Sequence, residues 1–289
     1  MKSYFSLSNS CRFLLMAALL VSVTSCKTLN RKISYPELVA SASPEAKAVM
    51  QKPEYENCEM RGNKKFEDVV LKCNLWGKAK LKGGDPKLCT FKQGDYWGWS
   101  WELPNNARGV IGYPALEVGR GPWGNKKKEK EAGFPVPVDD IKKLTVDYDF
   151  EMYVKHKKYN LAFDLWLTNE EFGNQKNITT EIMIWEDYFD FSSYGKVKDV
   201  IETPFGTYKV HVGWLENKKF EQNWNYIAFV RTETRVEGSV DIKYLLDYLV
   251  ANNHIDKNHY FTSVELGNEI GNSSGLALVK KFEYDFETK

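Results

Sequence analysis

One carboxylate, one thioether and one indole share a face of the segment Glu181-Ile182-Met183-Ile184-Trp185, if that segment is a strand. Strand side chains alternate between two faces, so Glu181, Met183 and Trp185 point one way and the two isoleucines point the other. A second acid stands far along the chain, in Gly267-Asn268-Glu269. Two acids from separate strands, beside aromatic rings that can stack on sugars, suit the hydrolysis of a glycosidic bond with retention of configuration.

Short strands are the elements expected to present these acids. Apolar residues at every second position from Leu144 to Met152 predict a half-buried antiparallel strand. Residues 242–250 follow the stripe of an amphipathic helix that stops before Asn252-Asn253. Many strands with one helix predict an all-β sandwich. The other expected strands cover residues 69–72, 96–103, 159–168, 181–188, 208–213, 226–231, 260–266 and 277–286.

Residues 1–26 have the pattern of an export signal. Lys2 and Arg12 precede an apolar run that is too short to span a bilayer as a helix. The run ends in Val23-Thr24-Ser25-Cys26, which resembles the lipobox of bacterial lipoproteins, where the cysteine is acylated and becomes the mature N-terminus. Lys27 stands where inner-membrane retention would show an Asp, so the resemblance implies a lipid anchor in the outer membrane or at the cell surface. An ordinary secretory signal with an incidental cysteine is the alternative.

Residues 27–54 are expected to form a flexible tether to one domain over residues 55–289. The tether is polar, contains Ser41-Ala42-Ser43-Pro44 and has no strand pattern, although its Ala-rich part can be transiently helical. The mature part, roughly 260 residues, is within the range that β-sandwiches fill as one domain. No repeat or internal linker follows residue 54.

Composition and charge narrow the classes of partner. The formal net charge is +1, so no overall field draws the chain to nucleic acid, and a neutral substrate fits better. Aromatic residues make up 14% of the chain, and they serve both as core and as sugar platforms. The four histidines have no metal-ligand spacing, and no helix follows the Gly-rich segment 119–124 as a dinucleotide loop requires. We expect no metal, no cofactor and a monomer.

Three cysteines, Cys58, Cys73 and Cys89, remain in the mature domain. An exported chain permits disulfides, and three cysteines form at most one intramolecular pair. The residues alone leave open which pair forms, or whether all three are reduced.

Six motifs then occur along the chain. They are Asn74-Leu75-Trp76-Gly77, Trp97-Gly98-Trp99-Ser100-Trp101, Tyr113-Pro114 with Gly119 through Trp123-Gly124, Phe163-Asp164-Leu165, Glu181 to Trp185, and Gly267-Asn268-Glu269. In this order they resemble glycoside hydrolase family 12, the small endoglucanases and xyloglucanases, from about Cys58 to Glu287. The resemblance implies a β-jelly-roll sandwich of two antiparallel sheets with a concave substrate cleft and one α-helix. It also implies a Cys58–Cys89 disulfide, with Cys73 as a buried free thiol.

The resemblance assigns roles to individual residues. Glu181 is the expected nucleophile and Glu269 the expected general acid/base. A nucleophilic carboxylate must be ionised, whereas its partner must hold a proton, and the charge of the first raises the pKa of the second. Asp164 is expected to support Glu181 by a hydrogen bond. The expected substrate contacts are Asn74, Trp76, Trp99, Met183 and Trp185, with the last two flooring the cleft.

Three positions depart from the family pattern. Asn268 replaces the usual Thr before the acid/base, and Ile270-Gly271 replaces a Pro-aromatic pair after it, which leaves the aglycone contacts open. Glu265 stands where members usually carry a Gln. We interpret it as a surface acid, because the four strand residues up to Glu269 span roughly 13 Å. The alternative is that it raises the pKa of its neighbours.

Two other functions compete with this hypothesis. Residues Glu181 to Glu186 also resemble the Glu-Ile-Asp-Ile-x-Glu motif of glycoside hydrolase family 16, although Met183 replaces its central Asp, and that family needs its acid/base at Glu186. A non-catalytic glucan-binding surface protein is the second alternative. The favoured hypothesis is a lipid-tethered, retaining endo-β-1,4-glucanase acting on a neutral β-glucan, such as cellulose, mixed-linkage glucan or xyloglucan.

Overall fold

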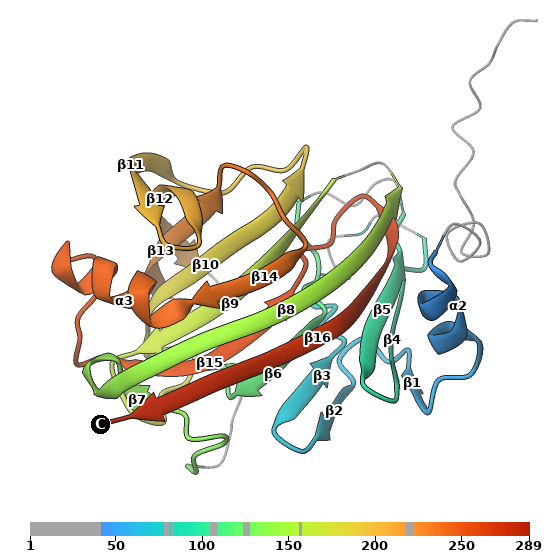
Figure 1. Cartoon of the computed structure of the whole chain (residues 1–289), viewed down its shortest axis with the longest axis horizontal. Helices are drawn as coiled ribbons and strands as arrows, with labels where there is room; N and C mark the ends of the chain where they lie inside the picture. Colours follow the sequence, from blue (N-terminus) through green and yellow to red (C-terminus); the bar gives the residue numbers. More distant parts are fainter. Residues whose placement is uncertain are drawn as a thin grey trace, which may run out of the picture. The chain divides into compact units, whose positions relative to one another are not determined.

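The structure, a computed structural model, describes residues 42–77, 81, 84–104, 109–123, 128–155, 158–217 and 222–289. The predicted signal, its Cys26 and the first part of the predicted tether lie outside these residues. Two β-sheets form the described domain (Figure 1). None of the described helices is long and apolar enough to cross a membrane.

The smaller sheet has six strands. Their spatial order is β1 (Tyr55–Asn57), β4 (Lys87–Gln93), β5 (Tyr96–Glu102), β16 (Ser274–Thr288), β8 (Ile141–Lys155) and β14 (Glu237–Asp241). The alternation predicted from Leu144 to Met152 is confirmed in β8, where Val146, Tyr148 and Phe150 are buried between more exposed residues.

The larger sheet has ten strands. Its order is β11 (Lys196–Thr203), β12 (Gly206–Asn217), β13 (Gln222–Arg231), β10 (Ile178–Phe189), β9 (Tyr159–Thr168), β15 (Tyr260–Gly267), β6 (Ala115–Gly119), β3 (Val69–Lys72) and β2 (Asn63–Phe66), and β7 (Val136–Pro137) pairs with β15. The prediction of purely antiparallel sheets is wrong at one place, because β10 and β13 pair in parallel. The chain returns through β11 and β12 before it reaches β13, which makes this pairing possible.

The main core lies between the two sheets. Ile182 and Ile184 of β10 belong to it together with Phe150 of β8, whereas Met183 and Trp185 belong to a separate cluster. The period of two predicted for residues 181–185 is therefore confirmed. We call the side of the ten-stranded sheet that carries Met183 and Trp185, turned away from the main core, the outer face.

The described residues contain two α-helices and a 3-10 turn at Val138–Asp140. The predicted helix is α3 (Ile242–Ala251), whose Asp241 side chain caps it by accepting a bond from the Tyr244 N–H at 2.9 Å. Its leucines pack into the main core.

Helix α2 (Pro44–Gln51) corrects the predicted tether. The Ser43 hydroxyl caps it, and Ala46 and Val49 are buried with Phe91 of β4 and two leucines of β16. Because this helix packs on the sheet, the folded domain begins upstream of residue 55.

The cysteines behave as the family resemblance implies. Cys58 and Cys89 form a disulfide that joins the segment after β1 to β4. Cys73 is free and buried, and burial raises the pKa of its thiol to about 12. Both predictions are confirmed.

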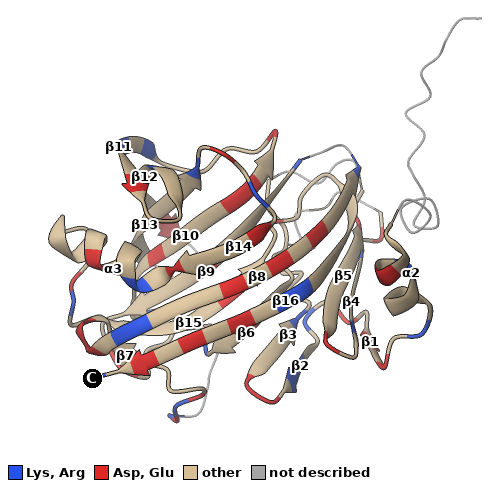
Figure 2. Cartoon of the chain, viewed as in Figure 1, with Lys and Arg blue, Asp and Glu red and all other residues tan. Residues whose placement is uncertain are grey.

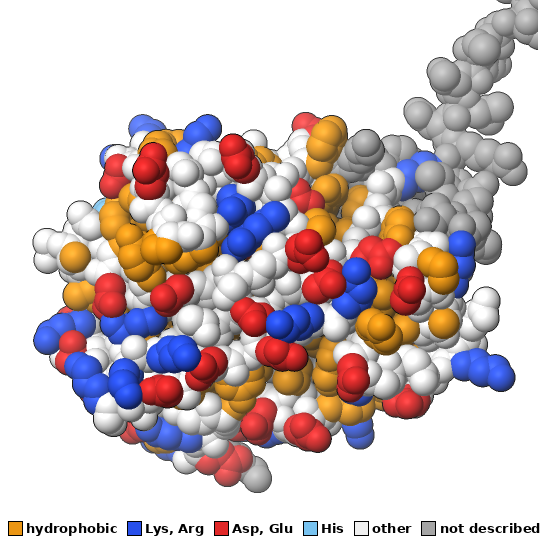
Figure 3. Space-filling view, viewed as in Figure 1, with side chains coloured by type: hydrophobic (Ala, Val, Ile, Leu, Met, Phe, Trp, Pro, Cys, Tyr) orange, Lys and Arg blue, Asp and Glu red, His pale blue; other side chains and the backbone are white. Residues whose placement is uncertain are grey.

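The solvent face of the six-stranded sheet carries charges of both signs. Acidic and basic residues are interspersed along β8 and β16 in Figure 2, and the space-filling view in Figure 3 shows no area of a single charge on this side. Lys281 pairs with Asp147 at 3.0 Å and Lys142 with Glu287 at 2.9 Å. Exposed pairs of this kind contribute at most about 1 kcal/mol each. This face is a solvated surface.

Candidate active site

Strand register brings three acids together on the outer face. Met183 of β10 lies opposite Asp164 of β9, and Asp164 lies opposite Glu265 of β15. Glu181 is two residues from Met183 on the same face, so it is a diagonal neighbour of Asp164. Side chains from these three neighbouring strands therefore converge.

Glu181 is half-buried and held by one donor. The indole N–H of Trp224, on β13, donates to Oε2 of Glu181 at 2.8 Å. Burial raises the pKa of Glu181 to about 7; the Trp224 hydrogen bond opposes this rise, and the charge of Glu265 adds to it. A carboxylate with this pKa is ionised only from about neutral pH upward.

Glu269 follows the end of β15 and is fixed by Asn160 of β9. The Glu269 backbone N–H donates to Asn160 Oδ1 at 2.7 Å, and Asn160 Nδ2 donates to the Glu269 carboxylate. Burial and then the charge of Glu181 raise the pKa of Glu269 to about 8, against the Asn160 hydrogen bond. The two predicted acids therefore act on each other electrostatically, although 88 positions separate them in the sequence.

Asp164 is buried beside both acids. Burial, followed by the charges of Glu181, Glu265 and Glu269, raises the pKa of Asp164 well above its usual range, and Lys72 opposes the rise. This carboxyl therefore holds its proton to higher pH than an ordinary aspartic acid does. Its Oδ1 atom has no hydrogen-bond partner within the described part of the chain. The structure places Asp164 where the prediction needs it, but this atom makes no supporting bond to Glu181.

The acid set has a definite chemical capacity. Between the two pKa values, about 7 and about 8, Glu181 is ionised while Glu269 still holds its proton. Such a pair provides a nucleophile and a proton donor at once.

Met183 and Trp185 lie on the outer face as predicted, but they are not open to a sugar. Both side chains are only 2% exposed. The ring of Phe191 stacks on Trp185 with centroids 5.4 Å apart, because the segment after β10 folds back over the strand. The Met183 sulfur accepts bonds from Trp185 Nε1 and from the Tyr226 hydroxyl. The prediction that they floor a cleft by direct sugar contact is corrected to a supporting role under this segment.

Trp99 is in the main core, so its prediction as a sugar platform is wrong. Its side chain has no exposed surface and packs against Phe150 at 5.5 Å. Sequence periodicity puts Trp99 on one face of β5 but does not say which face is inside. Its indole N–H donates to Asn268 Oδ1 at 2.5 Å, so Trp99 instead fixes the residue before Glu269.

The segment from Asn74 to Gly77 lies beside the chain around Glu269. Gly77 N–H donates to Ile111 O at 2.7 Å, and Ile111 N–H donates to Ile270 O at 2.9 Å. Trp76 is 42% exposed there. Asn74 and Trp76 stay predicted substrate contacts.

Sequence reasoning missed a group of tryptophans next to Glu181. Trp123 makes edge contacts with Trp166 at 4.9 Å and with Trp224 at 6.2 Å. It also missed Tyr226, on the outer face of β13, and Asn160. The alternation of Trp224, Tyr226 and Ala228 in β13 was a signal for Trp224 and Tyr226. Asn160 had no such signal, because its role depends on how the chain leaves β15.

Glu265 is not a surface acid, contrary to the favoured interpretation. It is 2% exposed, and its Oε2 lies 2.7 Å from Nζ of Lys72. Its charge raises the pKa values of both Glu181 and Asp164, as the alternative interpretation expects. The interpretation failed because burial here comes from the segment after β6, whose path the sequence does not reveal.

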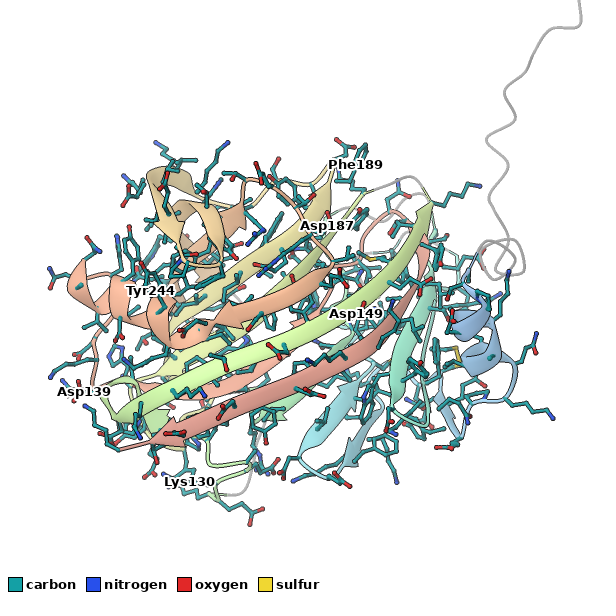
Figure 4. The ribbon with its side chains drawn as sticks, viewed as in Figure 1. Lys130, Asp139, Asp149, Asp187, Phe189 and Tyr244 are labelled. Carbon is teal, nitrogen blue, oxygen red and sulfur yellow. A yellow bond between two sulfur atoms is a disulfide. The ribbon has the colours of Figure 1, made fainter. Side chains whose placement is uncertain are left out.

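Glu186 lies on the other face of β10 and excludes the family 16 alternative. It is fully buried, and it accepts hydrogen bonds from Tyr148 at 2.6 Å and from Arg235 at 2.5 Å. Figure 4 shows Asp187 and Phe189 just beyond it, where β10 ends. A bulge between Trp185 and Asp187 does not turn Glu186 toward the outer face, so it cannot share a substrate with Glu181.

Two other groupings do not include the acids. A pocket of about 460 Å³ lies where residues 179–180 of β10 meet the end of α3, with His254 and His259 in its lining. Among the described residues, Glu56, Cys58 and Cys89 have potential metal-ligand atoms close together. Those cysteines are joined in the disulfide and offer no thiolate.

Comparison with known proteins identifies the family and the fold. Residues 67–287 match the model of glycosyl hydrolase family 12. Endoglucanase S from Pectobacterium parmentieri is 29% identical over 230 residues, which cover 78% of this chain and 83% of that protein. A native family 12 xyloglucanase from Bacillus licheniformis superimposes with a TM-score of 0.72 at 21% identity, over 81% of this chain and 100% of that one. Endoglucanase Cel12A from Rhodothermus marinus gives 0.65 at the same identity and coverage.

The two solved structures share the fold, a β-jelly roll. The family model covers most of the described domain and includes both Glu181 and Glu269. The chain belongs to glycosyl hydrolase family 12 and is a glycoside hydrolase.

Proposed function

We propose that this chain is an endo-β-1,4-glucanase that cuts internal bonds of a neutral β-glucan and retains the configuration at the anomeric carbon. The observation that carries the proposal is the electrostatic pairing of Glu181 with Glu269. Burial and the charge of Glu181 raise the pKa of Glu269 to about 8, whereas Glu181 has a pKa of about 7. One acid is ionised while the other holds its proton.

In the first step, Glu181 attacks the anomeric carbon while Glu269 gives its proton to the glycosidic oxygen. The glycosidic bond breaks, the reducing-end fragment leaves, and a glycosyl ester forms on Glu181. Trp224 donates to Oε2 of Glu181. We therefore assign the attack to Oε1, which that hydrogen bond leaves free.

In the second step, water completes the hydrolysis. The esterified Glu181 carries no charge, so the pKa of Glu269 falls and its carboxylate can take a proton from water. The water oxygen then attacks the same anomeric carbon and releases Glu181 as a carboxylate. Asn160 holds Glu269 through both steps by its bonds to the backbone N–H and the carboxylate. Two inversions give net retention.

The substrate class follows from the relatives and from the exposed rings. The similar proteins are named endoglucanases and a xyloglucanase. Cellulose and xyloglucan, two of the expected substrates, share a β-1,4-glucan backbone. Trp76 is 42% exposed and Trp123 is half-buried beside Glu181, so both rings can pack on a sugar face. The net charge of +1 agrees with a neutral polymer.

Product analysis tests the proposal. We expect residues 42–289 to release reducing ends from soluble cellulose derivatives, mixed-linkage glucan or xyloglucan, with a fast fall in viscosity because internal bonds break. Proton NMR should show the β-anomer first. Binding of these polymers without new reducing ends would point to a glucan-binding protein, and initial release of the α-anomer would contradict retention.

We also propose that the chain is exported and lipid-anchored through Cys26, and that it acts as a monomer. The lipobox-like sequence Val23-Thr24-Ser25-Cys26 supports the anchor. We expect metabolic palmitate labelling and membrane fractionation in a bacterial host, and loss of both in Cys26→Ser. An unlabelled, soluble exported form of the unmodified chain would favour the ordinary secretory signal. Sedimentation of the domain checks the monomer.

A further inference from the structure

Three buried charges lie on the outer face behind the acid pair. They are Lys72 on β3, Glu117 on β6 and Glu265 on β15, which are 8%, 4% and 2% exposed. Nζ of Lys72 lies 2.7 Å from Glu265 and 3.4 Å from Glu117. We call these three residues the ion cluster. It contains two carboxylates and one ammonium.

The segment after β6 covers the ion cluster. Gly121 N–H donates to Oε1 of Glu117 at 2.7 Å. A Cβ atom at Gly121 would lie 2.8 Å from Oε1 of Glu265 and 3.0 Å from Oε1 of Glu117, so any other residue there would push the carboxylates aside. Water is largely excluded from the cluster, and its charge is therefore weakly screened.

Register connects the ion cluster to the nucleophile. Glu117 lies opposite Glu265, and Glu265 lies opposite Asp164. Directly opposed residues on one face of a sheet have Cβ atoms about 5 Å apart. Glu265 is therefore the immediate neighbour of Asp164, whereas Glu117 is one strand farther away.

Several groups face Glu181 from the surrounding elements. Glu265 raises the pKa of Glu181, and Trp224 lowers it. Glu265 also raises the pKa of Asp164, and Lys72 lowers it. The titratable neighbours are Asp164 on β9, Tyr226 on β13, Glu265 on β15, Glu269 after β15, Lys72 on β3, Glu117 on β6 and Tyr113 before β6.

We propose that the ion cluster positions charge for the reaction: Glu265 fixes a buried negative charge on the face that carries Asp164 and Glu181, and this charge moves the acid limit of activity upward. Glu265 is thus a positioning residue and touches no substrate. This inference rests on the proposed role of Glu181. It gives the chain a neutral working range that a glutamine at position 265 would not.

The test compares two variants that each remove one negative charge from the same cluster. In Glu265→Gln, the acid limb of the pH profile of kcat/KM on a neutral chromogenic β-1,4-gluco-oligosaccharide should move down by about one pH unit. In Glu117→Gln, the matched control, the movement should be clearly smaller, because Glu117 is one strand farther from Asp164. Both variants keep one carboxylate as partner for Lys72.

Two further variants separate the proposal from a purely structural role. Glu265→Asp keeps the charge and should restore the limb of the unchanged protein. Lys72→Met changes the charge in the opposite sense and should move the limb to higher pH. The proposal is overturned if the acid limb does not move in Glu265→Gln or Lys72→Met, whichever of the two folds. Equal shifts in Glu265→Gln and Glu117→Gln would also overturn it, even if thermal stability falls. Failure of the proposed function looks different: Glu181→Gln would then keep its activity.

Discussion

Strand β10 presents two glutamates, one on each face, and their surroundings differ. Glu186 faces the main core and accepts hydrogen bonds from Tyr148, Tyr208 and Arg235. A guanidinium nitrogen of Arg231 also lies 3.9 Å from its Oε2. Glu181 faces outward, and in the described part of the chain one indole N–H donates to it. Glu186 is paired with arginines and accepts hydrogen bonds from hydroxyls, whereas Glu181 has other carboxylates for neighbours.

This difference separates a structural acid from a reactive one. A buried charge that is fully paired stabilises one arrangement of the chain, and breaking the pair is costly. A buried carboxylate near like charges has a raised pKa and keeps an oxygen free for chemistry. The predictions below test whether the two faces of β10 divide the roles in this way.

The largest effect is expected from Glu181→Gln. Amide replacement keeps the shape but removes the nucleophile, so kcat should fall on the order of 10⁴-fold or more. Steady-state hydrolysis of mixed-linkage glucan measures this, with a thermal melt as the check on folding. A variant that melts normally and keeps more than a tenth of the activity would remove Glu181 from the mechanism.

Glu269→Ala should lower kcat by about 10² to 10⁴-fold on a polymer, since the leaving oxygen then departs without a proton. A β-cellobioside with a dinitrophenolate leaving group needs no such proton. We therefore expect a much smaller loss in the rate of the first step on that substrate, seen as a burst of dinitrophenolate. Equal losses on both substrates would speak against proton donation by Glu269.

Glu186→Gln should instead lower stability. The glutamine amide is uncharged and keeps only one acceptor oxygen, so Arg235 loses its ionic partner and the bonds from Arg235 and the two tyrosines cannot all form. We expect this to cost about 3 kcal/mol of unfolding free energy. Urea titration measures this. Activity per folded molecule should change by only a few-fold, and loss on the scale of Glu181→Gln in a folded variant would return Glu186 to consideration as the acid/base.

Trp224→Phe should give the smallest effect. It removes the hydrogen bond that stabilises the ionised form of Glu181 and lowers its pKa, so this pKa should rise above about 7. The acid limb of kcat/KM should therefore move to higher pH, by up to about one unit. Trp166→Phe is the matched control, because the Trp166 indole nitrogen has no hydrogen-bond partner among the described residues. Equal shifts in both variants would mean that packing, not the N–H group, sets the limb.

Periodicity predicted much of the fold and one part of the site. Strands β3 and β9 have the predicted limits, and the face of Glu181 follows from a period of two. Strand β11 was missed because its first five residues are all exposed, so it lacks the alternation of a half-buried strand. Helix α2 was assigned to the tether because its eight residues bury only two side chains.

The rest of the site depends on contacts between distant segments. Periodicity assigns Trp99 to one face of its strand but does not say that this face is the inner one, so it does not distinguish a core tryptophan from a sugar platform. Phe191 covers Trp185, and Gly121 covers Glu265, through segments that follow their strands without a regular pattern. Such segments decide burial, and their paths are set by tertiary contacts.

The most direct test of the central claim is to trap the covalent intermediate. A 2-deoxy-2-fluoro β-cellobioside with a dinitrophenolate leaving group should form a glycosyl ester, because fluorine slows both steps and the leaving group rescues the first. Intact-mass measurement followed by peptide mapping locates the added sugar. We predict one fluorocellobiosyl group on Glu181. A label on Glu186 or Glu269, or turnover with no adduct and release of the inverted anomer, would contradict the account.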